Sequence, residues 1–347
     1  MKSRLEIIAA TCLLVASSAS GETPRRQLTQ RVQIFYYGWY GTPEQNGKYF
    51  HWDQNERLPP QDIASSFYPS LGPYSSTDGD LIAQHMRWIQ SMGVGVLIFA
   101  WQDDVLSREV TSLVMDTAWQ YGIQVAFLID QNPPKRPEEV IGAVETLTAQ
   151  FGNHPAFYRI GRATRHGRSI DPRGVFYVFN PFLGGLVNPS EWVPWMDRLR
   201  DTYYDPVLLG QGFNLLANER AHFDGLFTFD VLKAEPGSFH SFKEQARQAG
   251  LIFVPTIGPG YDDQRAVDSP AGYRSREQGS LYDRFWEEVV RVQPEWVSLN
   301  SFNEWHEGTQ IEPAVRMETP FARYRHYEGS YGRSGNDAES AYLLRTA

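Results

Sequence analysis

The chain has 347 residues and a formal net charge of −9, with 41% hydrophobic and 21% charged residues. This composition is that of a globular protein, and the length suits one large domain such as an α/β barrel of about 250 residues or more. The acidic balance argues against nucleic acid and anionic lipid as partners, and it suits a neutral ligand such as a sugar.

Residues 1–20 have the pattern of a secretory signal peptide. Lys2 and Arg4 precede an apolar run at residues 7–16, which is shorter than the roughly 20 residues of a membrane-spanning helix. We therefore expect a secreted or periplasmic mature chain without stable membrane insertion; the alternative is an uncleaved signal anchor facing a Golgi lumen. The single cysteine, Cys12, lies in this segment, so we expect neither a disulfide nor a cysteine-bound zinc in the mature chain.

Eight apolar runs alternate with helical patterns along the rest of the chain. The predicted strands lie at residues 32–37, 94–101, 124–130, 174–180, 207–210, 225–230, 251–257 and 296–302. Their continuous apolarity indicates strands that are covered on both faces, as in parallel sheets. The predicted helices lie at residues 80–90, 110–121, 138–151, 190–203, 213–223 (the weakest pattern), 239–249 and 278–292, with a short closing helix at 338–346.

This alternation predicts a single (β/α)8 TIM barrel of class α/β, with long loops after the strands, over residues 30–347. A doubly wound open sheet would show a similar alternation. Eight strands without a glycine-rich phosphate loop favour the barrel. The long non-helical stretches at residues 38–76, 131–137 and 258–276 all follow strands, so we expect them at the face where barrels carry their active sites.

Glu304 and Glu307 follow the last predicted strand, in the segment Asn303-Glu-Trp-His-Glu-Gly308. One glutamate near a strand end is usually a solvated charge, but two among aromatic residues suit glycoside cleavage. Residues three apart point to opposite faces of a strand and meet only on a helical turn. The strand must therefore end near Asn303, and Gly308 favours the turn. The compact spacing favours retention, for which carboxyls lie about 5–5.5 Å apart.

One of the two carboxyls must hold a proton for the leaving oxygen while the other is ionised, and the residues alone leave open which is which. A metal site is disfavoured. The helical zinc motif needs a histidine four residues after His306, and position 310 is Gln. The pairs Asp103-Asp104 and Asp262-Asp263 also lack calcium-loop spacing. We expect neither a metal nor another cofactor.

Residues at the other strand ends are candidate sugar contacts. Trp101 is a candidate stacking platform, the alternative being a rim aromatic that covers the barrel top. His51 is either a sugar contact or part of a packed loop. The remaining candidates are Tyr37, Tyr40, Tyr177, Tyr261 and Asn303.

The segment at residues 301–312, Ser-Phe-Asn-Glu-Trp-His-Glu-Gly-Thr-Gln-Ile-Glu, closely resembles the signature of glycoside hydrolase family 99. The members of this family are endo-α-1,2-mannosidases and endo-α-1,2-mannanases. Other segments that resemble the family precede it, in the same order along the chain, at residues 35–41, 47–52, 65–69, 71–76, 124–127 and 257–261.

The resemblance implies a (β/α)8 barrel without a metal that cleaves internal α-1,2-mannosidic bonds with retention. It also implies that Glu307 is the general acid/base and that Glu304 is a base on the 2-hydroxyl of the sugar, giving a 1,2-anhydro sugar intermediate. In that case the separation of the carboxyls need not match the usual nucleophile distance. The expected partner is α-mannan or a high-mannose oligosaccharide, and the expected state is a monomer.

The chain departs from the family at the pocket walls. It has Tyr177-Val-Phe179-Asn180 where the family has Tyr-x-Tyr-Asp, and Phe227-Thr-Phe229 where the family has Tyr-Thr-Tyr. Residues 264–273 also lack the family's Pro-Trp-Asn pattern. These changes bear on the preferred sugar rather than on the reaction class. The alternative is a non-catalytic glycan-binding barrel, against which both glutamates argue.

Overall fold

The computed structural model describes residues 27–130, 135–161 and 172–347, so the predicted signal peptide lies outside it. Its main sheet is parallel and runs in the order β10-β13-β1-β3-β4-β6-β7-β8-β9, with the short β5 (Arg159–Ile160) antiparallel to β6. The strands are β1 (Thr29–Tyr37), β3 (Val94–Trp101), β4 (Gln124–Ile129), β6 (Arg173–Val178), β7 (Val207–Gln211), β8 (Gly225–Phe227), β9 (Ile252–Val254), β10 (Thr256–Ile257) and β13 (Val297–Leu299).

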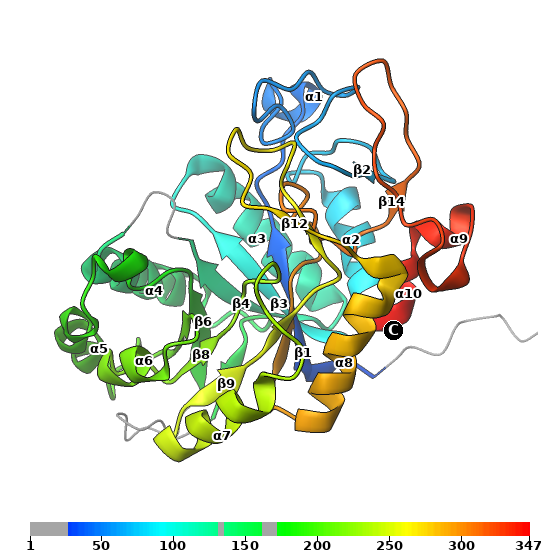
Figure 1. The fold of residues 1–347 in the computed structure, drawn as a ribbon. Helices are drawn as coiled ribbons and strands as arrows, with labels where there is room; N and C mark the ends of the chain where they lie inside the picture. Colours follow the sequence, from blue (N-terminus) through cyan, green and yellow to red (C-terminus); the bar gives the residue numbers. More distant parts are fainter. Residues whose placement is uncertain (1–26, 131–134, 162–171) are drawn as a thin grey trace, which may run out of the picture.

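The sheet closes through one interrupted strand. Only Pro255 separates β9, which pairs with β8, from β10, which pairs with β13. Proline has no N–H to donate, while the Pro255 carbonyl accepts from the Ser298 N–H at 3.0 Å, so the strand changes partner at this residue. With β9 and β10 taken together, eight parallel strands form the predicted (β/α)8 barrel, which is thereby confirmed (Figure 1).

Helices cover the outside of the barrel (Figure 1). They are α2 (Gly79–Ser91), α3 (Val105–Gln120), α4 (Pro137–Phe151), α5 (Val193–Leu199), α6 (Leu215–Arg220), α7 (Phe239–Ala249) and α8 (Ser280–Val292), with α9 (Asn336–Glu339) and α10 (Ala341–Thr346) closing the chain. None of the helices that the structure describes is long and apolar enough to cross a membrane.

Two of the predicted helices are shorter than expected. The pattern at residues 190–203 forms a 3₁₀ turn at Pro189–Glu191 followed by α5, which stops before Arg200 because that residue leaves the helical region with ψ of 136°. The pattern at residues 213–223 forms only α6. By contrast, α2 starts within one residue of the predicted helix at residues 80–90. It follows Asp78, whose carboxylate accepts from the N–H groups of Asp80 and Leu81.

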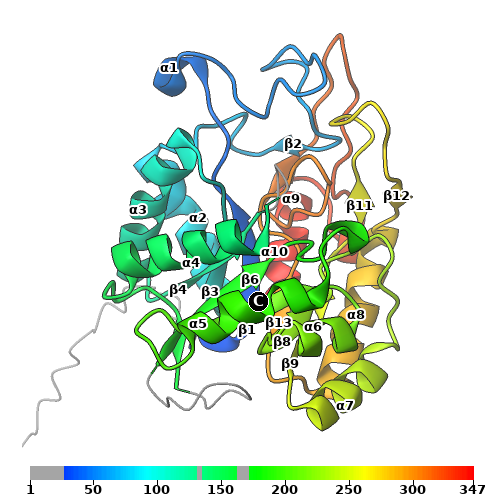
Figure 2. The ribbon, with the colours of Figure 1, turned by 90° about the vertical axis from the view of Figure 1, so that its left-hand side faces the viewer.

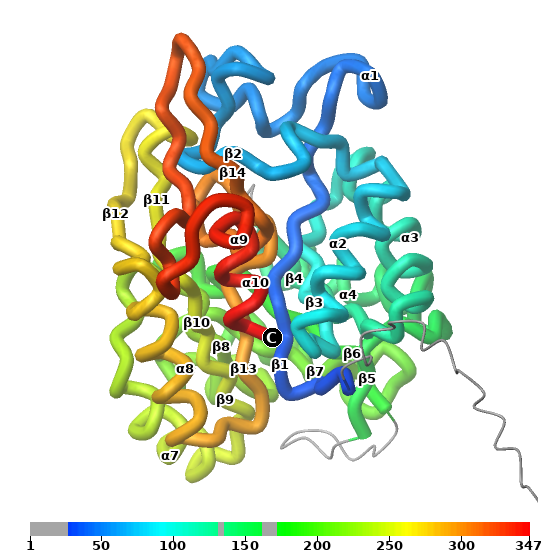
Figure 3. Tube along the Cα trace, turned by 90° about the vertical axis from the view of Figure 1, so that its right-hand side faces the viewer, coloured from blue at the N-terminus to red at the C-terminus, as the bar shows by residue number. Residues whose placement is uncertain are grey.

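The long loops gather at one end of the barrel. Figures 2 and 3 show α1 (Pro43–Asn46), β2 (Tyr68–Pro69), β14 (Ala314–Val315) and the antiparallel pair β11 (Tyr261–Asp262) and β12 (Tyr273–Arg274) at the end opposite α7. Antiparallel pairing of β2 with β14 ties the first long loop to the C-terminal segment. This is the end at which the strands finish, and in this fold it carries the active site.

Candidate active site

The chain turns sharply after the eighth strand. β13 ends at Leu299, three residues earlier than predicted, and the Asn300–Ser301 peptide bond is cis. A turn over residues 305–308 follows, in which Gly308 has φ of 61°. A Cβ atom on Gly308 would lie 2.9 Å from the Asp262 carbonyl oxygen, so both conformation and space demand glycine. The predicted turn at Gly308 is confirmed, and we call residues 303–308 the catalytic turn.

Asn303 and Tyr40 anchor the catalytic turn to the first strand. The Asn303 amide accepts from the Tyr37 N–H and donates to the Tyr37 carbonyl, both at 2.8 Å. The Tyr40 hydroxyl donates to the Asn303 carbonyl and accepts from the Trp305 N–H, both at 3.1 Å. Both side chains are fully buried. They were predicted to contact sugar, but their polar groups are engaged with the protein backbone, so we assign them a positioning role instead.

Tyr177 lies inside the barrel and not at its mouth. Its hydroxyl donates to the Gln33 side-chain oxygen at 2.7 Å, and its ring packs edge-on against Phe35 and Phe227. Inward-pointing side chains of barrel strands fill the core in this way. The prediction of a sugar contact for Tyr177 is therefore wrong, because its only hydroxyl is buried against Gln33.

Glu307 is surrounded by groups that disfavour its charge. Burial is the largest cause, and the nearby charges of Asp230, Asp263 and Asp130 add to it, raising the pKa of Glu307 to about 7. A carboxyl with such a pKa holds its proton near neutral pH, as a general acid must.

Glu304 is more deeply buried, at 3% exposure. Burial and then the charge of Glu307 raise its pKa, while backbone N–H groups of the catalytic turn favour its ionised form. One of these, the His306 N–H, donates to Glu304 Oε1 at 3.0 Å. The Glu304 N–H in turn donates to Ser301 Oγ at 2.8 Å. The two glutamates thus interact electrostatically and compete for one proton.

Neutral imidazoles flank the carboxyl pair. His306 Nε2 donates to the His51 carbonyl at 2.8 Å, so in the neutral ring Nδ1 carries no hydrogen. Nδ1 lies 3.7 Å from Glu304 Oε1. Burial lowers the pKa of His306 to about 4 and that of His51 to about 3. The His51 ring stacks on Trp39 with centroids 4.8 Å apart. Neither histidine therefore neutralises Glu304 at neutral pH.

Two of three further predicted contacts, Tyr37 and Tyr261, lie near the pair. Burial and then the charges of Glu304 and Glu307 raise the pKa of Tyr37, so this tyrosine lies in the field of both carboxylates. Tyr261 donates to Asp263 Oδ2 at 3.2 Å and lines the same pocket as Glu307. Trp101 ends β3 and is only 4% exposed. Sugar contacts by Tyr37, His51, Trp101 and Tyr261 stay predictions.

A pocket of about 150 Å³ opens beside Glu307. Phe179 and Phe229, two of the departures from the family pattern, form its aromatic wall and meet edge-to-face at 5.0 Å. The polar residues around it are Gln211, Asp230, Lys233, Tyr261 and Asn300. The substitutions noted in the sequence therefore reach the pocket at positions 179 and 229, whereas Phe227 is buried in the barrel.

A buried network beneath the catalytic turn was missed by the sequence analysis. Glu312 Oε2 accepts from the Tyr74 hydroxyl at 2.8 Å and from Trp305 Nε1 at 3.0 Å, and its other oxygen pairs with His85 Nε2 at 3.2 Å. His85 Nδ1 lies 3.0 Å from the Tyr36 hydroxyl. This network holds the tryptophan that stands between the two glutamates. Glu312 belongs to the signature segment, but no spacing rule links it to residue 85.

Across the described residues, no group of three or more His, Cys, Asp and Glu side chains is arranged to hold a metal ion.

Comparisons with known proteins identify the family and the fold. The model of Glycosyl hydrolase family 99 matches residues 27–347. Glycoprotein endo-alpha-1,2-mannosidase-like protein of Homo sapiens is 33% identical over 336 residues, which are 85% of this chain and 71% of that protein. Glycoprotein endo-alpha-1,2-mannosidase of Rattus norvegicus is 32% identical over 337 residues, 85% and 70% of the two chains. The GH99 endo-alpha-mannosidase from Bacteroides thetaiotaomicron superposes with a TM-score of 0.81 at 30% identity, covering 92% of this chain and 96% of that one.

Proposed function

Since the chain belongs to glycosyl hydrolase family 99 and is a glycoside hydrolase, we propose that it cleaves internal α-1,2-mannosidic bonds in mannan or mannose-rich N-glycans, with retention. The observation that carries the proposal is the catalytic turn. It holds two electrostatically coupled glutamates at the mouth of the eighth strand. The names of the relatives supply the bond type, and the raised pKa of Glu307 supports its role as the proton donor.

In the first step Glu307 donates its proton to the glycosidic oxygen as the bond from the anomeric carbon to that oxygen breaks. Glu304 takes the proton of the 2-hydroxyl, and the freed oxygen attacks the anomeric carbon from the opposite face. The product is a 1,2-anhydro sugar, with Glu307 ionised and Glu304 protonated. The raised pKa of Glu307 suits the donor.

In the second step Glu307 takes a proton from water, whose oxygen attacks the anomeric carbon. The bond from that carbon to the 2-oxygen breaks, and Glu304 returns its proton to the 2-oxygen. Two inversions at the anomeric carbon give net retention, and both glutamates recover their starting protonation.

Digestion of α-1,2-linked manno-oligosaccharides tests the proposal. We expect the wild-type chain to release internal oligosaccharides and not single mannose units, and we expect the Glu307→Gln and Glu304→Gln variants to lose this activity. Wild-type protein that binds the glycan without cleaving it would favour the non-catalytic glycan-binding barrel instead.

A further inference from the structure

Asn300 lines the pocket beside Glu307, and only the NH2 group of its side-chain amide forms a hydrogen bond within the described residues. The side chain is 1% exposed, and Nδ2 donates to the Phe229 carbonyl at 3.1 Å. A carbonyl can only accept, so this bond identifies the NH2 end of the amide. The opposite atom, Oδ1, has no hydrogen-bond partner among the residues that the structure describes. The pocket therefore contains a buried acceptor without a donor.

The position of Asn300 is tightly held. Its N–H donates to the Ile257 carbonyl at 2.8 Å, and its carbonyl oxygen packs so closely against Gly258 that a Cβ there would lie 2.3 Å away. The Phe229 N–H, next to the carbonyl that binds the amide, donates to Thr256 Oγ1 at 2.9 Å. Oδ1 therefore cannot leave the pocket wall without disturbing the ends of β8 and β10.

A buried acceptor without a donor is costly, and native proteins satisfy nearly all such groups. Phe179 and Phe229 form the neighbouring wall and their side chains offer no O–H or N–H. Gln211, Lys233 and Tyr261 also line the pocket, but none of them bonds to Oδ1 in the structure. A ligand in the pocket can supply the missing donor, and a sugar hydroxyl is an O–H donor of the right kind.

We propose that Asn300 Oδ1 accepts a hydrogen bond from a hydroxyl of the sugar unit that occupies the pocket beside Glu307. This inference rests on the proposed function and adds a specificity residue to it. A sugar that lacks this hydroxyl leaves Oδ1 unpaired and binds less well, which is how polar sites reject deoxy analogues.

Asn218 provides a matched control. It is also fully buried, its Nδ2 also donates to a backbone carbonyl, that of Asn214 at 3.0 Å, and its Oδ1 also lacks a hydrogen-bond partner in the described parts of the chain. It lies on α6 and does not line the pocket beside Glu307. We expect Asn300→Ala and Asn218→Ala to lower Tm to a similar extent. Only Asn300→Ala should raise KM for an α-1,2-linked manno-oligosaccharide, by about tenfold.

Monodeoxy derivatives of the same oligosaccharide identify the hydroxyl. For the wild type, removal of one particular hydroxyl should raise KM about tenfold, and for Asn300→Ala the same removal should have no effect. An Asn300→Ala variant with the wild-type KM and the wild-type sensitivity to every deoxy analogue would overturn this inference alone. A wild-type chain that neither binds nor cleaves any of these glycans would overturn the proposed function and this inference together.

Discussion

At the scale of single residues, the charges around Glu307 determine what it can do. Burial and three aspartates disfavour its ionised form. Burial and the charge of Glu307 also raise the pKa of Glu304 well above its ordinary value, against the backbone N–H groups that favour its charged state. The spacing of the two glutamates predicted this pair. The sequence could not predict that Asn303 and Tyr40 bond to backbone groups, because those contacts join residues more than 260 positions apart.

The first prediction concerns the pH dependence of cleavage. The first step needs protonated Glu307, whose pKa is about 7, so kcat/KM should fall tenfold per unit well above that pH. It also needs ionised Glu304, whose pKa is raised, so kcat/KM should fall again on the acid side as Glu304 takes up a proton. Initial rates on an α-1,2-linked manno-oligosaccharide between pH 5 and 9 measure this. A profile that stays flat to pH 9 would exclude Glu307 as the acid.

The second prediction concerns stability. The folded pKa of Glu307, about 7, exceeds its ordinary value of 4.5, so the bound proton stabilises the fold at low pH and this contribution is lost as the pH rises through 7. Glu307→Gln should therefore raise Tm relative to wild type at pH 8 and leave it nearly unchanged at pH 5, while kcat falls at least about 10²-fold.

The exposed Glu318 serves as the control, and Glu318→Gln should change neither Tm nor kcat. Thermal unfolding curves at the two pH values decide the matter. Equal shifts in Tm at pH 5 and pH 8 would show that the charge of Glu307 is not the cause.

At the scale of elements, the strands were predictable and their ends were not. Continuous apolar runs placed every barrel strand, since each is buried on both faces. β13 nevertheless stops at Leu299, because the chain turns back on itself beyond it; for example, the Ser301 N–H donates to the Thr309 carbonyl. α5 ends early because Arg200 turns toward buried aspartates. Neither contact shows in the apolar pattern from which the strands and helices were predicted.

The third prediction concerns the catalytic turn. Gly308→Ala should lower stability by about 1–2 kcal/mol for its left-handed conformation, with a further loss from the clash with Asp262. Gly332→Ala is the matched control, since Gly332 has φ of 70° and open space around it. Only Gly308→Ala should also reduce kcat. Denaturant unfolding and initial rates test this, and equal kcat values for the two variants would contradict a positioning role for the turn.

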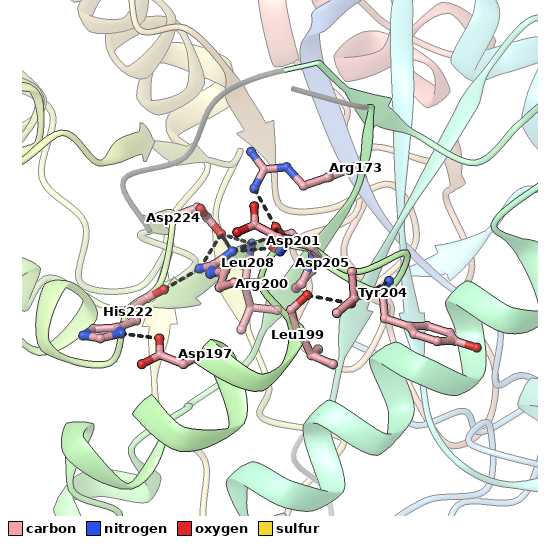
Figure 4. A network of polar contacts seen from close by, with 12 residues as sticks. Arg173, Asp197, Leu199, Arg200, Asp201, Tyr204, Asp205, Leu208, His222 and Asp224 are labelled. Carbon is pink, nitrogen blue, oxygen red and sulfur yellow. Dashed lines mark hydrogen bonds and ion pairs between the residues drawn. The ribbon is translucent and has the colours of Figure 1, made fainter. Parts of the chain in front are cut away.

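At the scale of the whole molecule, one end of the barrel carries the candidate active site and the other carries a buried cluster of ion pairs. Opposite the active site, Arg200 joins Asp205 at 2.8 Å and Asp224 at 3.3 Å, and Arg173 pairs with Asp205 at 3.2 Å (Figure 4). These residues precede or begin β6, β7 and β8, so the cluster ties the starts of three strands to the end of α5.

The fourth prediction follows from this cluster. Arg200→Ala leaves two buried aspartates without their shared cation and should cost about 3–5 kcal/mol. Arg198→Ala is the control, because Arg198 pairs with Glu145 in an exposed position and should cost less than about 1 kcal/mol. Denaturant unfolding measures both. In the folded fraction of each variant, kcat at 25 °C should stay unchanged. Similar losses of unfolding free energy for the two variants would mean that the buried cluster does not stabilise the barrel.

The central claim is that Glu304 and Glu307 together cleave an α-mannosidic bond with retention. Proton NMR during the first minutes of digestion of an α-1,2-linked manno-oligosaccharide tests it most directly, because the new reducing end appears before mutarotation. The α-anomer should appear first, and the β-anomer should grow in later. Initial release of the β-anomer would contradict the account.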